Sequence, residues 1–278
     1  MKRGVHGTRT RSRTISRAGC ATLAAGCALA AASGCSSPGT AVTVAADPVA
    51  AVRQAGSASG HIGTAAIATS VTMTADGKTE QFSGTGSYDF TKQVGSIILT
   101  VPPDVSAHGT LDEIVTPSTL YMRPDGDTGK WVKVDSAKLA DGDLISAGYT
   151  SPALAFAMLA GAGAAGGSVG YAGQDTVYNV PVAHYTGTLN LAAAAAAASA
   201  PVNTALADAS RSFSKQSVPF DVYLDAQGRV LRFIAHFEFP APAPQKGEVS
   251  IVSSTDLYDI GKPVTASAPA TADVLAGN

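Results

Sequence analysis

Cys35 is the reactive side chain with the most informative surroundings in this chain. Six Lys or Arg and no acidic residue lie within residues 1–17, whereas residues 18–34 carry no charge and consist largely of Ala, Gly and Leu. A basic segment, an apolar segment and small residues at its exit are typical of a secretory signal peptide. We therefore predict a signal peptide over residues 1–34, which directs the following chain out of the cytoplasm.

The run Ala32-Ser33-Gly34-Cys35 resembles the lipobox of bacterial lipoproteins, although Ala32 stands where Leu is most usual. The resemblance implies that the Cys35 thiol takes a diacylglyceryl group and that cleavage leaves Cys35 as the first mature residue. Two acyl chains are enough for stable membrane anchoring. We expect a protein held on the extracytoplasmic face of the cell membrane through diacylglyceryl-Cys35.

Other interpretations of this leader stay open. A transmembrane anchor needs about 20 apolar residues, and the uncharged run of 17 is shorter and poor in large side chains. Cys20 lies close to the basic Arg17, and lipidation at Cys27 would leave an apolar segment of about nine residues, near the lower limit. Simple secretion after cleavage at the Ala-rich exit is the main remaining alternative.

The charge of the exported chain argues against two kinds of partner. All three cysteines lie at or before position 35, so the mature domain contains no disulfide. Without the six basic residues of the leader, 13 of the 19 Lys and Arg remain against 21 Asp and Glu. This acidic balance argues against nucleic-acid binding, which needs a basic face, and against docking on anionic lipid through a polybasic patch.

No constellation of residues indicates catalysis. The mature chain has four dispersed histidines without metal-ligand spacing and no nucleophile elbow, P-loop or zincin motif. The acidic runs 112–113, 125–127 and 141–143 lack the pattern of a calcium loop and are interpreted as solvated loop acids. We therefore expect no enzyme, no metal and no cofactor.

Strands dominate the predicted secondary structure. Asp47 and Pro48 open a short helix that we expect to end by residues 56–57, and further helices are predicted over 153–160 and 191–198. The alanine run in the last of these is interpreted as a smooth helix lying close against a neighbour or as plain compositional bias. The clearest pattern is an alternating hairpin over 218–239. About ten antiparallel strands are expected; so long a sheet must twist and curl, with the helices covering its apolar side.

These elements divide the chain into four parts. Residues 1–34 are the signal peptide, and residues 35–47 are the lipidated cysteine and a flexible tether with a reach of about 20 Å. Residues 48–265 are predicted to form one folded domain. Residues 266–278, rich in Ala, Ser, Thr and Pro, form a loosely ordered tail.

Three segments together resemble a known family. They are residues 120–123 followed by 129–135, residues 184–191 leading into the alanine run, and residues 218–229. In this order they are similar to the actinobacterial LppX/LprA/LprF/LprG lipoproteins, which share a fold with the LolA and LolB lipoprotein carriers.

The resemblance implies an α+β fold, in which a few α-helices pack on the concave face of a strongly curved antiparallel β half-barrel. It also implies an apolar cavity that holds the acyl chains of a lipid or glycolipid, with small Ala and Gly residues in the helices leaving room. We expect a monomer whose cavity is lined by Leu154, Met158, Leu159, Ile97, Leu99, Phe220, Val222, Phe233 and Phe237.

Two alternatives accompany this expectation. The same apolar residues would form ordinary filled core in most proteins with this pattern, and the protein would then be an envelope sensor or scaffold acting through its outer surface. The helix over 154–159, followed by glycines at 161–170, distinguishes the two, because a lipid carrier needs a movable apolar lid with a hinge.

Overall fold

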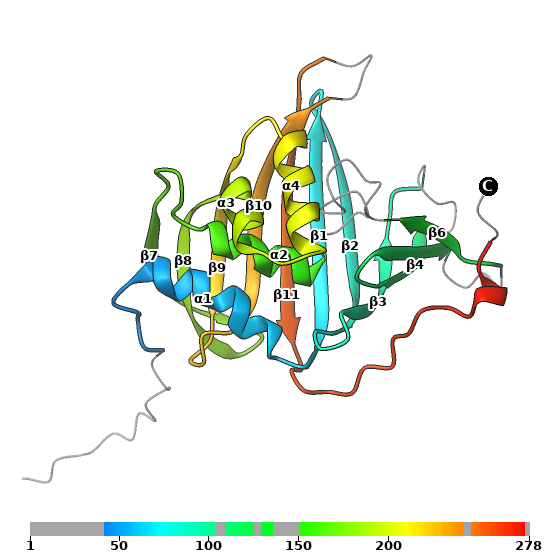
Figure 1. Cartoon of the computed structure of the whole chain (residues 1–278), viewed down its shortest axis with the longest axis horizontal. Coiled ribbons are helices and arrows are strands. Elements are labelled where there is room, and N and C mark those ends of the chain that lie inside the picture. The colour runs from blue at the N-terminus through cyan, green and yellow to red at the C-terminus, as the bar shows by residue number, and fades with distance from the viewer. Residues whose placement is uncertain (1–41, 104–108, 125–128, 136–150, 242–245, 276–278) are drawn as a thin grey trace, which may run out of the picture. The chain divides into compact units, whose positions relative to one another are not determined.

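One open sheet of eleven antiparallel strands organises the described part of the chain (Figure 1). The computed structural model describes residues 42–103, 109–124, 129–135, 151–241 and 246–275. Cys35 and the acidic runs 125–127 and 141–143 therefore lie outside the described residues. The strands are β1 Thr64–Ala75, β2 Lys78–Asp89, β3 Val94–Thr100, β4 Thr110–Val115, β5 Thr119–Pro124, β6 Val132–Asp135, β7 Val169–Val177, β8 Val180–Asn190, β9 Ser217–Leu224, β10 Val230–Pro240 and β11 Glu248–Tyr258.

The strands of the N-terminal and C-terminal halves join where the first strand of the chain, β1, pairs with the last, β11. The strand order is β6-β5-β4-β3-β2-β1-β11-β10-β9-β8-β7. In that pairing Val71 lies opposite Ser253 and Met73 opposite Ile251. The N-terminal and C-terminal strands therefore share one continuous sheet, with β6 and β7 at its two edges.

The helices cover one face of this sheet (Figure 1). They are α1 Pro48–Gly60, α2 Pro152–Met158 continued by the 3-10 turn η2 Leu159–Gly161, α3 Leu191–Ala197 and α4 Val202–Ser212, with a further 3-10 turn η3 Thr271–Asp273 near the C-terminus. None of the described helices has the length and apolar character needed to cross a bilayer. The predicted α+β half-barrel with helices on its concave face is confirmed.

Local sequence signals explain the hairpins and the first helix. Asp76 and Gly77 have φ angles of 48° and 73°, as the two-residue turn that joins twisted strands requires. The carboxylate of Asp47 accepts a hydrogen bond from the Ala50 amide at 3.0 Å, which confirms the predicted N-cap. In β9, burial alternates as expected, with Val218, Phe220, Val222 and Leu224 all turned inward.

The structure differs from the helix predictions at two places. Helix α1 continues to Gly60 instead of ending by residues 56–57, and α4 was not predicted at all. In α4, Leu206 and Ala209 are fully buried. The few large apolar residues of this helix follow a proline and an alanine run, so its periodicity is weak in the sequence, and packing on the sheet stabilises it instead.

Gly56 explains why α1 does not end at its glycine. A Cβ at this position would overlap the carbonyl oxygen of Phe156 in α2, so the missing side chain lets the two helices approach closely. A glycine inside a helix costs roughly 1 kcal/mol relative to alanine. The close contact with α2 offsets that cost, because the backbone of Phe156 occupies the space that a side chain at position 56 would fill.

Replacing Gly56 with alanine is expected to lower the free energy of unfolding by about 1–3 kcal/mol, because overpacking outweighs the gain in helix propensity. Gly60 in the same helix provides a matched control, since a Cβ there meets nothing within 4 Å. Urea denaturation followed by circular dichroism would measure both variants. Gly60→Ala should be neutral or stabilising, and equal effects of the two substitutions would contradict the close contact.

The C-terminal segment pairs with the start of β6. The Trp131 amide donates to the Asp273 carbonyl oxygen at 2.8 Å, and the Leu275 amide donates to the Trp131 carbonyl oxygen at 2.8 Å. The guanidinium of Arg123 lies 4.2 Å from the centre of the Trp131 ring. Part of the segment that was expected to be loosely ordered therefore adds backbone hydrogen bonds at this edge of the sheet.

Candidate functional site

The nine side chains predicted to line a cavity come together in one apolar cluster. They lie on β3 (Ile97, Leu99), β9 (Phe220, Val222), β10 (Phe233, Phe237), α2 (Leu154, Met158) and η2 (Leu159), and each is at most 8% exposed. The rings of Phe220 and Phe233 lie 6.2 Å apart between their centres. The sequence thus identified the interior between the helices and the sheet, whereas the lining of a ligand cavity by these residues stays a prediction.

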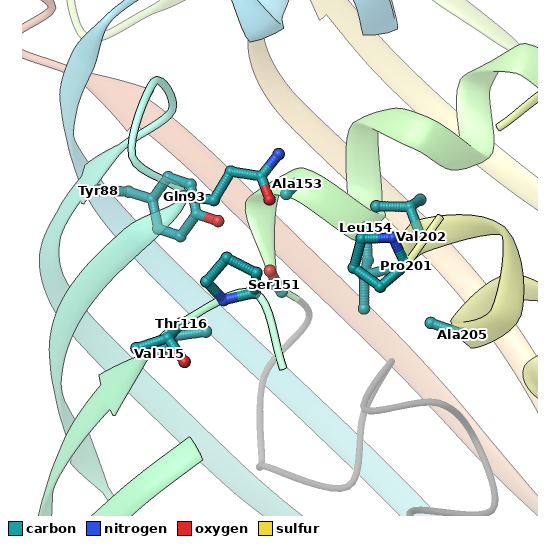
Figure 2. A pocket seen from close by; sticks show the side chains of 11 residues that line it. Tyr88, Gln93, Val115, Thr116, Ser151, Ala153, Leu154, Pro201, Val202 and Ala205 are labelled. Carbon is teal, nitrogen blue, oxygen red and sulfur yellow. The ribbon is translucent and has the colours of Figure 1, made fainter. Parts of the chain in front are cut away.

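A small pocket opens between the first residues of α2 and α4 and the strands β2 and β4 (Figure 2). Its volume is about 50 Å³, and it is lined by Tyr88, Gln93, Val115, Thr116, Pro117, Ser151, Ala153, Leu154, Pro201, Val202 and Ala205. Pockets that bind small molecules usually measure about 300–1,000 Å³. An acyl chain would therefore enter at this place only if α2 and α4 moved apart.

The helical side of this pocket combines two alanines with two larger apolar side chains. Ala153 and Leu154 come from α2, and Val202 and Ala205 come from α4. Each alanine removes little apolar area from water, and burial stabilises by roughly 25 cal/mol per Å². The two alanines therefore add little to the cost of separating α2 from α4, whereas each methylene of an entering chain contributes about 0.8 kcal/mol.

Polar groups gather at the strand side of the pocket. The Tyr88 ring is 2% exposed, and burial raises the pKa of Tyr88 to about 12, an effect that the side-chain hydrogen bond with Ser151 partly offsets. Gln93, in a turn with a positive φ of 54°, and Thr116 add an amide and a hydroxyl. An apolar interior next to a few oriented polar groups suits an amphiphilic ligand.

An aromatic series connects this rim with α2. The Tyr88 and Phe90 rings meet edge to face at 4.9 Å between their centres, and Phe90 stacks on Phe156 of α2 at 5.8 Å. Gly95 in β3 leaves space for the Tyr88 ring, since a Cβ at Gly95 would lie 2.5 Å from Cδ2 of Tyr88. Sequence analysis missed Tyr88 as a site residue, because its helical neighbours at the pocket, Ser151 to Leu154 and Pro201 to Ala205, come from segments more than 60 positions away in the sequence.

The segment that follows α2 and η2 is fixed to β8 and to α1. The Gly163 amide donates to the Thr188 carbonyl oxygen of β8 at 2.9 Å, and Nε of Arg53 donates to the Ala162 carbonyl oxygen at 2.8 Å. The glycines after α2 were interpreted as a hinge for a lid. A hinge at this place would have one side held by β8, so opening would displace the N-terminal end of α2, where Leu154 faces the pocket.

The interpretation of Asp112 and Glu113 as solvated loop acids was wrong. Both residues lie in β4, where the Asp112 carboxylate pairs with Nε of Arg123 at 3.1 Å. Glu113 is fully buried and lies opposite Ile97 of β3 and Met122 of β5. The alternation of the strand turns Glu113 toward the covered face, which the acidic pair by itself could not indicate.

The outer face carries a polar and aromatic network. Nε2 of His184 lies 2.7 Å from the Asp221 carboxylate, and the imidazole stacks on Tyr223 at 4.3 Å between ring centres. Arg232 forms two hydrogen bonds with Asp256, at 2.8 and 2.5 Å. No group of three metal-ligating side chains occurs among the residues that the structure describes, and these pairs are interpreted as cross-strand contacts.

No protein-family model and no curated protein matches this chain. Its structure is similar to that of the lipoprotein LppX from Mycobacterium tuberculosis, at 14% identity and a TM-score of 0.46, over 79% of this chain and 97% of that one. It is also similar to LprF from Mycobacterium bovis (13%, TM-score 0.40, 80% and 97%) and to a LolA superfamily protein from Nitrosomonas europaea (9%, TM-score 0.34, 78% and 96%). At this level of similarity, function has to be argued from the residues of this chain.

Proposed function

We propose that this protein is a membrane-anchored extracytoplasmic lipoprotein that binds the acyl chains of a lipid or glycolipid between its helices and the concave face of its sheet, for transfer or presentation in the cell envelope. The observation that carries the proposal is the opening between α2 and α4, which leads to Leu154 and the apolar cluster behind it. Hydrocarbon chains need no specific polar contacts there. Tyr88, Ser151 and Thr116 would face the polar part of the ligand at the rim.

Loading would begin with the separation of α2 from α4. An acyl chain that enters replaces contacts among small side chains with contacts to the large apolar side chains of the interior, such as Phe220 and Phe233. Water is excluded from the chain as it enters, and this burial drives binding. None of these steps requires a reacting group, in keeping with the expectation that the protein is not an enzyme.

Ala205→Trp tests this proposal, because it places a large side chain in the opening. We expect native mass spectrometry of the mature protein, purified from bacterial membranes, to show bound lipid for the wild type and a several-fold smaller lipid-bound fraction for the variant. Extraction and identification of the lipid would name its class. Ala196→Trp is the matched control, since Ala196 is exposed on α3, and it should retain the bound lipid.

The close packing of the interior favours a second candidate function. Met158, Leu159 and Val222 have no exposed surface, as in a filled core, and a filled core would leave a sensor or scaffold that acts through its outer surface. A wild-type protein that carries no lipid and takes up none from added phospholipid or glycolipid would favour this function and refute lipid binding. Equal lipid-bound fractions in the two tryptophan variants would place the ligand elsewhere.

A further inference from the structure

The turn between β7 and β8 exposes apolar side chains at one end of the sheet. Tyr178 is 48% exposed and Val180 is 40% exposed. The Tyr178 ring stacks on Tyr258 at the end of β11, with 4.6 Å between the ring centres. Together with Leu231 and Ile260 they border an open pocket of about 430 Å³. We call Tyr178, Val180 and Tyr258 the tyrosine tip.

The backbone holds this tip in a defined conformation. Tyr178 and Asn179 have φ angles of 46° and 65°, a left-handed conformation that is unusual for a bulky side chain. A bulge between Val230 and Arg232 separates Leu231 from the main core and lets it pack with Val177 behind the tip. This packing supports the two tyrosines from within the sheet.

The basic side chains next to the tip are neutralised by carboxylates. Arg229 pairs with Asp225 at 2.6 Å, Lys262 with Asp259 at 2.6 Å, and Arg232 with Asp256 at 2.5 Å. An anionic surface therefore finds little free positive charge here. Tyrosine, with an apolar ring and a polar hydroxyl, is enriched where the apolar and aqueous regions of a membrane meet.

The tether leaves the domain near the same end. The Gln174 side chain in β7 donates to the Val42 carbonyl oxygen at 3.3 Å. Tyr178 follows Gln174 by four residues, which corresponds to about 13 Å along a strand. Six residues separate Cys35 from Val42, so the two Cα atoms lie within about 25 Å of each other in any conformation. A lipid on Cys35 would thus hold this end of the sheet close to the bilayer.

We infer that the tyrosine tip rests in the headgroup region of the membrane and fixes the orientation of the domain on its surface. The inference rests on the proposed lipid anchor at Cys35 and adds a second contact with the membrane, one made by the folded domain. The partner is the interface of a bilayer of neutral or zwitterionic lipid, because the charges around the tip are already paired.

Site-directed fluorescence quenching tests the contact. The mature chain has no cysteine after Cys35, and lipidation blocks that thiol, so Val180→Cys provides one labelling site. We would reconstitute the lipidated protein in phosphatidylcholine vesicles containing lipids with a nitroxide on the headgroup. Val132→Cys is the control, because Val132 is 47% exposed and lies on the opposite edge strand β6. Quenching at position 180 should be several-fold stronger than at position 132.

The possible outcomes separate the tip from the anchor. A wild-type protein that does not float with the vesicles has no lipid anchor, which refutes the anchor and this inference with it. A protein that floats but is quenched equally at both positions refutes the tip contact alone. Concentration-dependent self-association through the labelled surface, detected by analytical ultracentrifugation, would make the tip a contact between two copies. That result would also overturn the inferred membrane contact. With the probe at position 180, Tyr178→Ser should reduce the quenching, and an unchanged value would exclude Tyr178 from the contact.

Discussion

Replacing Cys35 with serine is expected to release the protein from the membrane almost completely. Each buried methylene of an acyl chain contributes about 0.8 kcal/mol to membrane binding, so two long chains anchor stably, whereas the domain without them has only weak surface contacts. Fractionation of cells that express the wild type and Cys35→Ser, followed by immunoblotting, would measure the change. A mass increase of the wild-type N-terminal peptide that corresponds to a diacylglyceryl group would identify the modification.

The other two cysteines of the leader provide the controls. Cys20→Ser and Cys27→Ser should leave the protein in the membrane fraction, because cleavage before Cys35, as we propose, would remove both residues. If Cys27→Ser released the protein and Cys35→Ser did not, lipidation at Cys27 would replace our proposal. If all three variants stayed in the membrane, an uncleaved apolar leader would be the anchor, and release of the wild type into the medium would indicate simple secretion.

Replacing Phe220 with alanine is expected to lower the free energy of unfolding by about 3–5 kcal/mol. Phe220 is 1% exposed in β9, and its ring lies next to that of Phe233 on the neighbouring strand β10. Its truncation removes a large apolar side chain from close packing and leaves a void that the rigid sheet fills only in part. Urea denaturation with two independent probes would give the change, provided that the two transitions coincide.

Phe239 in β10 allows a graded comparison. It is only partly buried at the margin of the same cluster, so Phe239→Ala should cost clearly less than Phe220→Ala. A loss at Phe220 no larger than that at Phe239 would indicate that Phe220 faces open space, as it would in a preformed ligand cavity. The pair of variants therefore also tells whether the interior is closed until a ligand separates α2 from α4.

Elements with local signals could be predicted from the amino-acid residues alone. Asp76-Gly77 predicted a hairpin because the tight turn requires a left-handed backbone, and Asp47 predicted a helix start because its carboxylate can accept the free amides of the first turn. The alternation over 218–224 predicted one buried face in β9, since side chains of a strand point alternately to its two sides. The strand residues of the predicted lining, Ile97, Leu99, Phe220, Val222, Phe233 and Phe237, could be named as inward-facing for the same reason.

Features that depend on contacts between distant segments became visible only in the folded chain. The pairing of β1 with β11 cannot be read from either strand, because all antiparallel partners offer the same backbone groups. Glu113 was misassigned, because its burial depends on which face of β4 is covered. Helix α4 exists because the sheet below it buries Leu206, which a weak local periodicity could not indicate. The rim of the pocket combines Tyr88, Ser151 and Ala205, and only the folding of three separate segments onto one another brings them together.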